Sequence, residues 1–314
     1  NNLTTIRASE DRFDQTRWRR FLYASRLASA LGIWPFTDVL MSSETGNLLL
    51  ATLSAGPVGV GDRIGTMNTA NLLRAVRRDG VIVKPDVPLT PIDVSYLSES
   101  QLLLTPLIAS TYTDFGDLRA YYLFAFPLGP NTQAVFRLSD VGVSQPVYLY
   151  NSLDGTGRVV DPADLLSESI DNGWIYQEAA PIGISGVAVI GDSGHFVPLG
   201  KKRVTQLTDD GTVHLSIAFA KGETSRTIEG YSPDAPTITT VAGDVGVMDY
   251  NPRTLRFTIP VMPGADGTAS LQIARTGAGT GLRGAPGRER PRQDGGTDDR
   301  LLSSVSGVRQ AGAK

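Results

Sequence analysis

The sequence predicts two kinds of fold in succession: an α/β region with a parallel sheet or barrel over residues 1–95, and an antiparallel β-sandwich over residues 96–275. Three observations carry this prediction. Strand-like and helix-like segments alternate at first, the proline-rich stretch KPDVPLTPID then forms a stiff connector, and short β-like runs separated by Gly, Asp, Asn and Pro follow it. Residues 276–314 lose all hydrophobic periodicity, and we expect a disordered or artefactual tail there.

The first region contains two types of periodic segment. LTTIRA alternates like a strand, and the stretch from Asp11 to Leu31 places apolar side chains at helical spacing on one face. WPFTDVLM and PVGV are predicted strands, whereas TGNLLLATLSA and NTANLLRAVRRDG are predicted helices. The helical face of the first segment is predicted to consist of Trp18, Phe21, Leu22, Ser25 and Ala28.

Composition excludes several classes of chemistry. The 314 residues include no cysteine, which rules out disulfides, a thiol nucleophile and thiolate metal sites. The two histidines, His195 and His214, stand apart in β-like segments, and we expect structural or solvent-facing roles for both. A net charge of −3 gives no case for nucleic acid or an anionic membrane, and no apolar run approaches a membrane span. We expect no cofactor and no metal, so any chemistry rests on carboxylates, hydroxyls and backbone groups.

A glycine-rich stretch, SAGPVGVGDRIG at residues 54–65, raises the question of a nucleotide site. Gly59, Gly61 and Gly65 follow the pattern G-x-G-x-x-x-G, which is one residue longer than the dinucleotide fingerprint G-x-G-x-x-G. The fingerprint also needs an acidic residue at the end of a second strand, and the candidate, Asp79, ends a helical stretch instead. No Gly-Lys-Ser/Thr follows, which excludes a P-loop. We therefore interpret these glycines as structural, allowing a tight turn beneath a helix.

Three segments in register carry a resemblance to a known family: IRASED, GIWPFTDVLMSS, and SAGPVGVGDRIG with the LLRAVRRDGVIVKP that follows it. Their order and spacing resemble the end of the catalytic barrel in family 36 of the glycoside hydrolases, the alpha-galactosidase and raffinose-synthase type. The resemblance implies that residues 1–95 are the last strands and helices of a (β/α)8 TIM barrel, followed by a β-sandwich. It also implies an oligosaccharide or glycoside substrate and a retaining mechanism with two carboxylates.

The resemblance assigns roles to two residues of the first segment. Asp11 corresponds to the general acid/base, and Arg7, four residues earlier, to its arginine at the end of a barrel strand. Local sequence offers another interpretation, because Ser9 or Asp11 before an amphipathic helix is typical of an N-cap. Glu10 is a second carboxylate at the same place.

Further substrate-binding positions follow from the other two segments. Asp38 corresponds to a strand-end aspartate in the sugar pocket, although a loop aspartate that caps a turn is equally consistent with the local sequence. Trp34 could supply an apolar wall for a sugar face, or simply belong to the core. Asp62 and Arg63 correspond to the Asp-Lys of the Ser-Asp-Lys part of the family loop, with Gly61 in place of the serine and arginine in place of the lysine.

One departure from the family pattern limits this interpretation. The family nucleophile belongs to a Lys-x-Asp segment on an earlier strand, and none precedes Arg7; KPD at 84–86 lies in the connector and is rejected. We therefore expect the natural N-terminus and the nucleophile to lie upstream, and the chain alone to be inactive. Two alternatives remain open: a glycosyl transferase of the raffinose-synthase kind, and a non-catalytic carbohydrate-binding or structural protein of the same fold.

Overall fold

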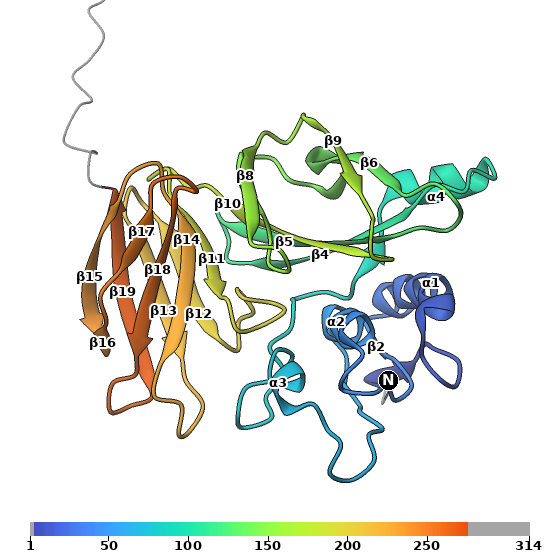
Figure 1. Cartoon of the computed structure of the whole chain (residues 1–314), viewed down its shortest axis with the longest axis horizontal. Helices are drawn as coiled ribbons and strands as arrows, with labels where there is room; N and C mark the ends of the chain where they lie inside the picture. Colours follow the sequence, from blue (N-terminus) through green and yellow to red (C-terminus); the bar gives the residue numbers. More distant parts are fainter. Residues whose placement is uncertain (1–2, 276–314) are drawn as a thin grey trace, which may run out of the picture. The chain divides into compact units, whose positions relative to one another are not determined.

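The computed structural model describes residues 3–275 (Figure 1). The predicted tail at residues 276–314 lies outside them. Within the described residues, no helix is both long and apolar enough to cross a membrane.

The N-terminal part contains the parallel strand pairing of the described chain. β1 (Thr5–Arg7) pairs in parallel with β2 (Trp34–Phe36), and Leu40 makes a parallel bridge to Val60. Parallel pairing of successive strands requires a crossover, and the helix between β1 and β2 provides it. The parallel α/β character predicted from the sequence is present, while closure into a barrel stays a prediction. The helices of this part are α1 (Trp18–Ala30), α2 (Thr45–Leu53) and α3 (Thr69–Leu72).

Helix α1 confirms its predicted buried face. Its five buried residues are those that the apolar spacing selects, and Trp18 packs edge-on against Phe124 and Phe126, with ring centroids 5.2 and 5.4 Å apart. The prediction for residues 68–80 is too long. Asn68 caps α3 as expected, but the helix ends after one turn, and Val76 then bridges antiparallel to Ile82.

The next part is a six-stranded antiparallel sheet in the order β3-β4-β5-β10-β7-β8, of which Figure 1 labels β4, β5, β8 and β10. Its strand β5 reads RAYYLFAF, a nearly continuous apolar run, because both faces of the sheet are covered. Tyr122 and Phe124 face the core shared with α1, whereas Tyr121 and Leu123 face a separate core. The strands are β3 (Thr90–Pro91), β4 (Leu107–Asp114), β5 (Arg119–Phe126), β7 (Val147–Asn151), β8 (Thr156–Val160) and β10 (Ile175–Pro181); β6 (Gln133–Arg137) pairs with β9 (Leu165–Ser169), and α4 (Asp93–Ser100) follows β3.

The last part is a pair of antiparallel sheets that enclose a core between them (Figure 1). Burial alternates residue by residue along β13, β18 and β19, as expected for strands with one face inward. The strands predicted over 96–275 thus divide among the six-stranded sheet, the β6-β9 pair and this sandwich, and the domain boundaries stay predictions. One sheet contains β11 (Ala188–Asp192), β14 (Arg226–Tyr231), β16 (Asp244–Val245), β17 (Asp249–Asn251) and β18 (Arg256–Met262); the other contains β12 (Val204–Asp209), β13 (Val213–Ala218), β15 (Pro236–Ala242) and β19 (Thr268–Arg275).

Candidate functional site

The carboxyl ends of β1 and β2 bring three predicted site residues together. Because the two strands are parallel and in register from Thr5 to Arg7, the residues that follow each strand emerge at the same edge. The Arg7 guanidinium lies 2.6 Å from Asp11 Oδ1 through Nη2 and 3.3 Å from Asp38 Oδ1 through Nη1. One arginine therefore bridges the carboxylate after each strand. We call Arg7, Asp11 and Asp38 the strand-end triad.

Backbone groups hold the triad in place. Arg12 has a left-handed backbone, with φ of 58°, and its N–H donates to Asp38 Oδ2 at 3.0 Å. The Asp38 N–H in turn donates to Ser9 Oγ at 2.6 Å. A non-glycine residue in this conformation is strained, and such strain persists where surrounding contacts fix it. The loop after β1 and the loop after β2 are thus linked to each other, a contact that local sequence did not reveal.

The structure decides which residue caps the helical segment. Asp14, not Ser9 or Asp11, accepts a hydrogen bond from the Thr16 N–H at the start of the 3-10 turn Gln15–Arg17, which leads into α1. The N-cap interpretation of Asp11 is therefore wrong. The Asp11 side chain is 84% exposed and has Arg7 as its ion-pair partner.

Glu10 is committed to a different set of contacts. Its carboxylate pairs with Arg20 and with Arg17, the latter at 3.2 Å. Hydrogen bonds from Arg20 and Arg17 lower the pKa of Glu10. A carboxylate held ionised in this way is poorly suited to deliver a proton near neutral pH. Glu10 thus pairs with Arg17 and Arg20, whereas Asp11 pairs with Arg7.

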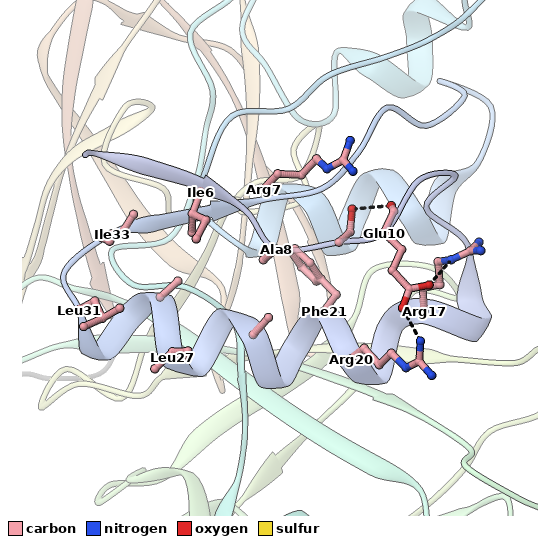
Figure 2. A pocket seen from close by; sticks show the side chains of 13 residues that line it. Ile6, Arg7, Ala8, Glu10, Arg17, Arg20, Phe21, Leu27, Leu31 and Ile33 are labelled. Atoms are coloured by element: carbon pink, nitrogen blue, oxygen red, sulfur yellow. Dashed lines mark hydrogen bonds and ion pairs between the residues drawn. The ribbon is translucent and has the colours of Figure 1, made fainter. Parts of the chain in front are cut away.

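An open apolar groove of about 360 Å³ lies between β1 and α1, next to the triad (Figure 2). Ile6 on the strand and Leu27 and Leu31 on the helix are 41%, 65% and 60% exposed. Arg17 and Arg20, held by Glu10, lie at one end of the groove (Figure 2). The signal for this groove was present in the sequence, because Leu27 and Leu31 lie one turn apart, outside the buried face of α1.

The remaining predicted residues lie elsewhere. Trp34 pairs with Thr5 at the start of β2, away from the carboxyl end, and the Lys84 ammonium lies 3.8 Å from its ring centroid. Burial lowers the pKa of Lys84, whose Nζ also donates to the Ala55 carbonyl at 2.5 Å. The structure therefore does not bring Trp34 to the triad.

Asp62 organises its own loop. Its two carboxylate oxygens accept from the Ser42 N–H at 2.9 Å and the Ser42 hydroxyl at 2.8 Å. The same hydroxyl accepts from the Asn68 N–H at 2.6 Å, which connects Asp62 to the cap of α3. The Arg63 side chain is exposed. The sugar-binding roles of Asp62 and Arg63 stay predictions.

The glycine-rich stretch packs closely against β2 and the residues after it. A Cβ on Gly56 would lie 1.9 Å from the Pro35 carbonyl oxygen, and one on Gly61 would lie 3.0 Å from Val39. Only glycine permits the first of these approaches. The stretch therefore has a packing role, in agreement with the structural interpretation of its glycines.

Comparisons with known proteins give a partial likeness. No protein-family model and no curated protein matches the chain. A solved structure of a GH27 β-L-arabinopyranosidase from Geobacillus stearothermophilus aligns with a TM-score of 0.38 and 13% identity over 57% of this chain and 45% of that one. A putative alpha-N-acetylgalactosaminidase from Bacillus halodurans aligns with a TM-score of 0.33 and 13% identity over 56% and 48%. The matched region spans less than half of either protein.

Proposed function

We propose that this chain is the C-terminal part of a retaining glycoside hydrolase acting on α-galactoside-type carbohydrates. The observation that carries the proposal is the strand-end triad, in which Arg7 bridges Asp11 and Asp38 at the carboxyl ends of parallel strands. Active sites of α/β barrels are built at this edge. Asp11 is the proposed general acid/base, with Arg7 and Asp38 orienting it and the sugar hydroxyls.

The proposed reaction has two steps. A carboxylate supplied upstream of Asn1 attacks the anomeric carbon while Asp11 gives its proton to the leaving oxygen, so that a glycosyl-enzyme ester forms and the alcohol departs. Asp11 then takes a proton from water, which attacks the same carbon and releases the sugar and the nucleophile. In retaining enzymes the two carboxyl groups lie about 5–5.5 Å apart. The missing partner would therefore lie beside Asp11.

The exposure of Asp11 bears on this mechanism. A carboxyl that gives up a proton near neutral pH needs partly apolar surroundings, yet the Asp11 side chain is 84% exposed. We propose that upstream barrel segments and the bound sugar supply that cover. The exposed apolar residues of the groove between β1 and α1 support this proposal, since exposed apolar patches mark surfaces that another element covers.

Two rival functions would draw on the same residues. A glycosyl transferase would use the same residues and differ only in how water is kept from the intermediate. A non-catalytic carbohydrate-binding protein would use Arg7 and Asp38 to bind sugar hydroxyls, with Asp11 serving only as an ion-pair partner of Arg7.

The test uses the intact protein, expressed from the gene with its upstream coding region. Asp11→Asn is expected to lower kcat on p-nitrophenyl α-galactoside at least about 100-fold, since general acid catalysis contributes on this scale. Asp14→Asn is the matched control: it lies on the same loop, and asparagine caps a helix as well as aspartate does. Unchanged turnover in Asp11→Asn would remove Asp11 from the mechanism. An inactive wild type that still binds galactose would favour the binding protein, and disaccharide synthesis in excess of hydrolysis would favour the transferase.

A further inference from the structure

Another cavity, of about 300 Å³, lies where the turn between β7 and β8 meets the turn between β9 and β10. None of the residues assigned above lines it. Its walls combine one indole with five polar side chains and two aliphatic ones. The indole and polar residues are Trp174, Asn151, Asp154, Ser169, Asp171 and Asn172.

Some polar side chains of this cavity are hydrogen-bonded within the turns, and others have donor or acceptor atoms without a partner in residues 3–275. Asp154 accepts from the Thr156 N–H and hydroxyl at 2.8 and 2.6 Å, and from the Asn151 amide at 2.9 Å. Asp171 uses only Oδ1, which accepts from the Ser169 hydroxyl at 2.6 Å. Within residues 3–275, Asp171 Oδ2 and the Asn172 side chain make no hydrogen bond to protein. An acceptor and an amide, which both donates and accepts, are thus available to a ligand.

The indole in the wall is held in a fixed orientation. Trp174 stacks on Phe124, with ring centroids 5.7 Å apart and planes 25° from parallel. It also packs on α2, because a Cβ at Gly46 would lie 2.8 Å from the indole nitrogen. A partly exposed aromatic ring that is already immobilised costs little conformational entropy on binding.

Charge narrows the class of ligand. No lysine or arginine lines the cavity, and the carboxylates of Asp154 and Asp171 repel anions. A metal is disfavoured too, since the described part of the chain holds no group of three or more His, Cys, Asp or Glu placed to bind one. A neutral molecule with several hydroxyls fits this lining, because its hydroxyls match the open polar groups and its C–H face matches the indole.

We propose that this cavity is a binding site for a neutral sugar ring of a glycan, with Trp174 as the apolar platform and Asp171 and Asn172 as the hydroxyl partners. The proposal stands apart from the role of Asp11. The two sites are nevertheless linked in space, because Gln15, four residues after Asp11, donates from Nε2 to the carbonyl of Gly173, which follows Asn172 by one residue, at 2.9 Å. A glycan bound here would thus contact the turn between β9 and β10, which is hydrogen-bonded to the segment that follows Asp11.

The test is a titration of the full chain with sugars, in which saturation-transfer NMR detects binding. Galactose and a neutral galactose-containing trisaccharide are expected to bind saturably in the millimolar range, and galacturonate, their anionic analogue, at least about ten-fold more weakly. Asn172→Ala, at an exposed position, and Trp174→Phe are each expected to weaken binding of the neutral sugars about ten-fold. Asp266→Asn is the control, because Asp266 lies in a turn that does not line the cavity, and this variant should bind the neutral sugars as the natural chain does.

The outcomes separate this site from the proposed active site. Binding that survives Asp11→Asn and fails in Asn172→Ala supports the cavity. Binding that fails only in Asp11→Asn places the sugar at the triad, which overturns this proposal and leaves the proposed function standing. No saturable binding of neutral sugar, or equal affinity for galacturonate, also overturns it.

Discussion

Two arginines in this chain each bridge a pair of carboxylates, in opposite environments. Arg7 joins Asp11 and Asp38 with side chains that are 44%, 84% and 22% exposed. Arg203 joins Asp192 and Glu223 with side chains that are 0%, 2% and 1% exposed. Both clusters consist of an arginine and two carboxylates, so the difference between them lies in burial. The exposed Arg7 cluster can exchange partners with a ligand, whereas the buried Arg203 cluster is fixed.

The buried cluster shows what fixing such charges requires. Arg203 binds Glu223 with two parallel hydrogen bonds of 2.7 and 2.9 Å, and its Nε lies 2.9 Å from Asp192. Arg226 pairs with Glu223 as well. Burial opposes ionisation of Glu223, but hydrogen bonds from Arg203 and Arg226 outweigh it and lower its pKa to about 2. Every charge of the cluster therefore has a partner.

The largest expected effect comes from removing each bridging arginine in turn. Arg203→Met takes the main partner from buried Glu223 and one of several partners from buried Asp192, which costs about 3–5 kcal/mol of unfolding free energy. Arg7→Met removes an exposed bridge and costs at most about 1 kcal/mol. Urea unfolding of the two variants measures the difference. Similar losses would show that burial does not separate the two bridges.

Should Arg203→Met fail to fold, a further variant keeps this test decisive. Adding Asp192→Asn and Glu223→Gln to Arg203→Met removes the two buried carboxylate charges and leaves Arg226, whose side chain is 22% exposed, as the remaining charge, so part of the lost stability should return. If the triple variant is no more stable than Arg203→Met, unpaired buried carboxylates are not the cause of the loss, and the charge explanation is wrong.

A third buried carboxyl, Glu178 on β10, sharpens the comparison because neither of its oxygens has a hydrogen-bond partner of good geometry within the described chain. Burial raises its pKa to about 8, from an ordinary value of 4.5. The unfolded chain therefore ionises at Glu178 from about pH 4.5 upward, while the folded chain stays protonated until about pH 8. Between these values the free energy of unfolding should fall by about 1.4 kcal/mol per pH unit.

Glu178→Gln tests this directly. The variant should lack that slope, so its stability relative to the natural chain should increase from pH 4.5 to pH 8 and then level off. Glu223→Gln is the counterpart. Its folded pKa lies below the ordinary value, so the stability that Glu223 contributes is lost as pH falls from about 4.5 towards 2. Unfolding curves across pH measure both, and parallel profiles for Glu178→Gln and the natural chain would contradict the assignment.

The sequence predicted the elements that a simple period defines. The alternation in TVHLSIAFA corresponds to β13, and the apolar spacing after Asp11 corresponds to the buried face of α1. It failed where contacts distant in sequence decide. Nothing local separates Asp14 from Asp11 as the cap, because Arg7, which pairs with Asp11, also pairs with Asp38 from beyond β2. Likewise YYLFAF cannot reveal, from period alone, that each of its faces meets a different core.

The candidate site was predictable in part for the same reason. Parallel strands must place their following residues at one edge, so Arg7 and Asp38 could be expected together once both strands were recognised. Trp34 could not be placed, because only the register shows that it begins β2 while Asp38 follows the end of that strand. The link from the Arg12 N–H to Asp38 depends on a left-handed residue that no sequence signal marks.

The smallest expected effect concerns that left-handed residue and its counterpart in the sandwich. Arg12 and Leu255 have nearly equal φ values, 58° and 55°. Glycine adopts this conformation without strain, and at Arg12 the bonds to Asp38 and Arg17 use only the backbone N–H and carbonyl. Arg12→Gly should therefore raise the free energy of unfolding by about 0.5–1 kcal/mol, the gain being reduced by the greater freedom of glycine in the unfolded chain.

Leu255→Gly should change stability in the opposite direction. The Leu255 side chain packs against the apolar cluster that contains Tyr148 and Tyr231, so glycine removes contacts as well as strain. Thermal unfolding of the two variants measures how the same backbone conformation affects stability in an exposed loop and beside an apolar cluster. A stability loss in Arg12→Gly would mean that its side chain, and not only its backbone, holds the loop of the triad. The exposed site would then depend on side-chain contacts in the way the buried cluster does.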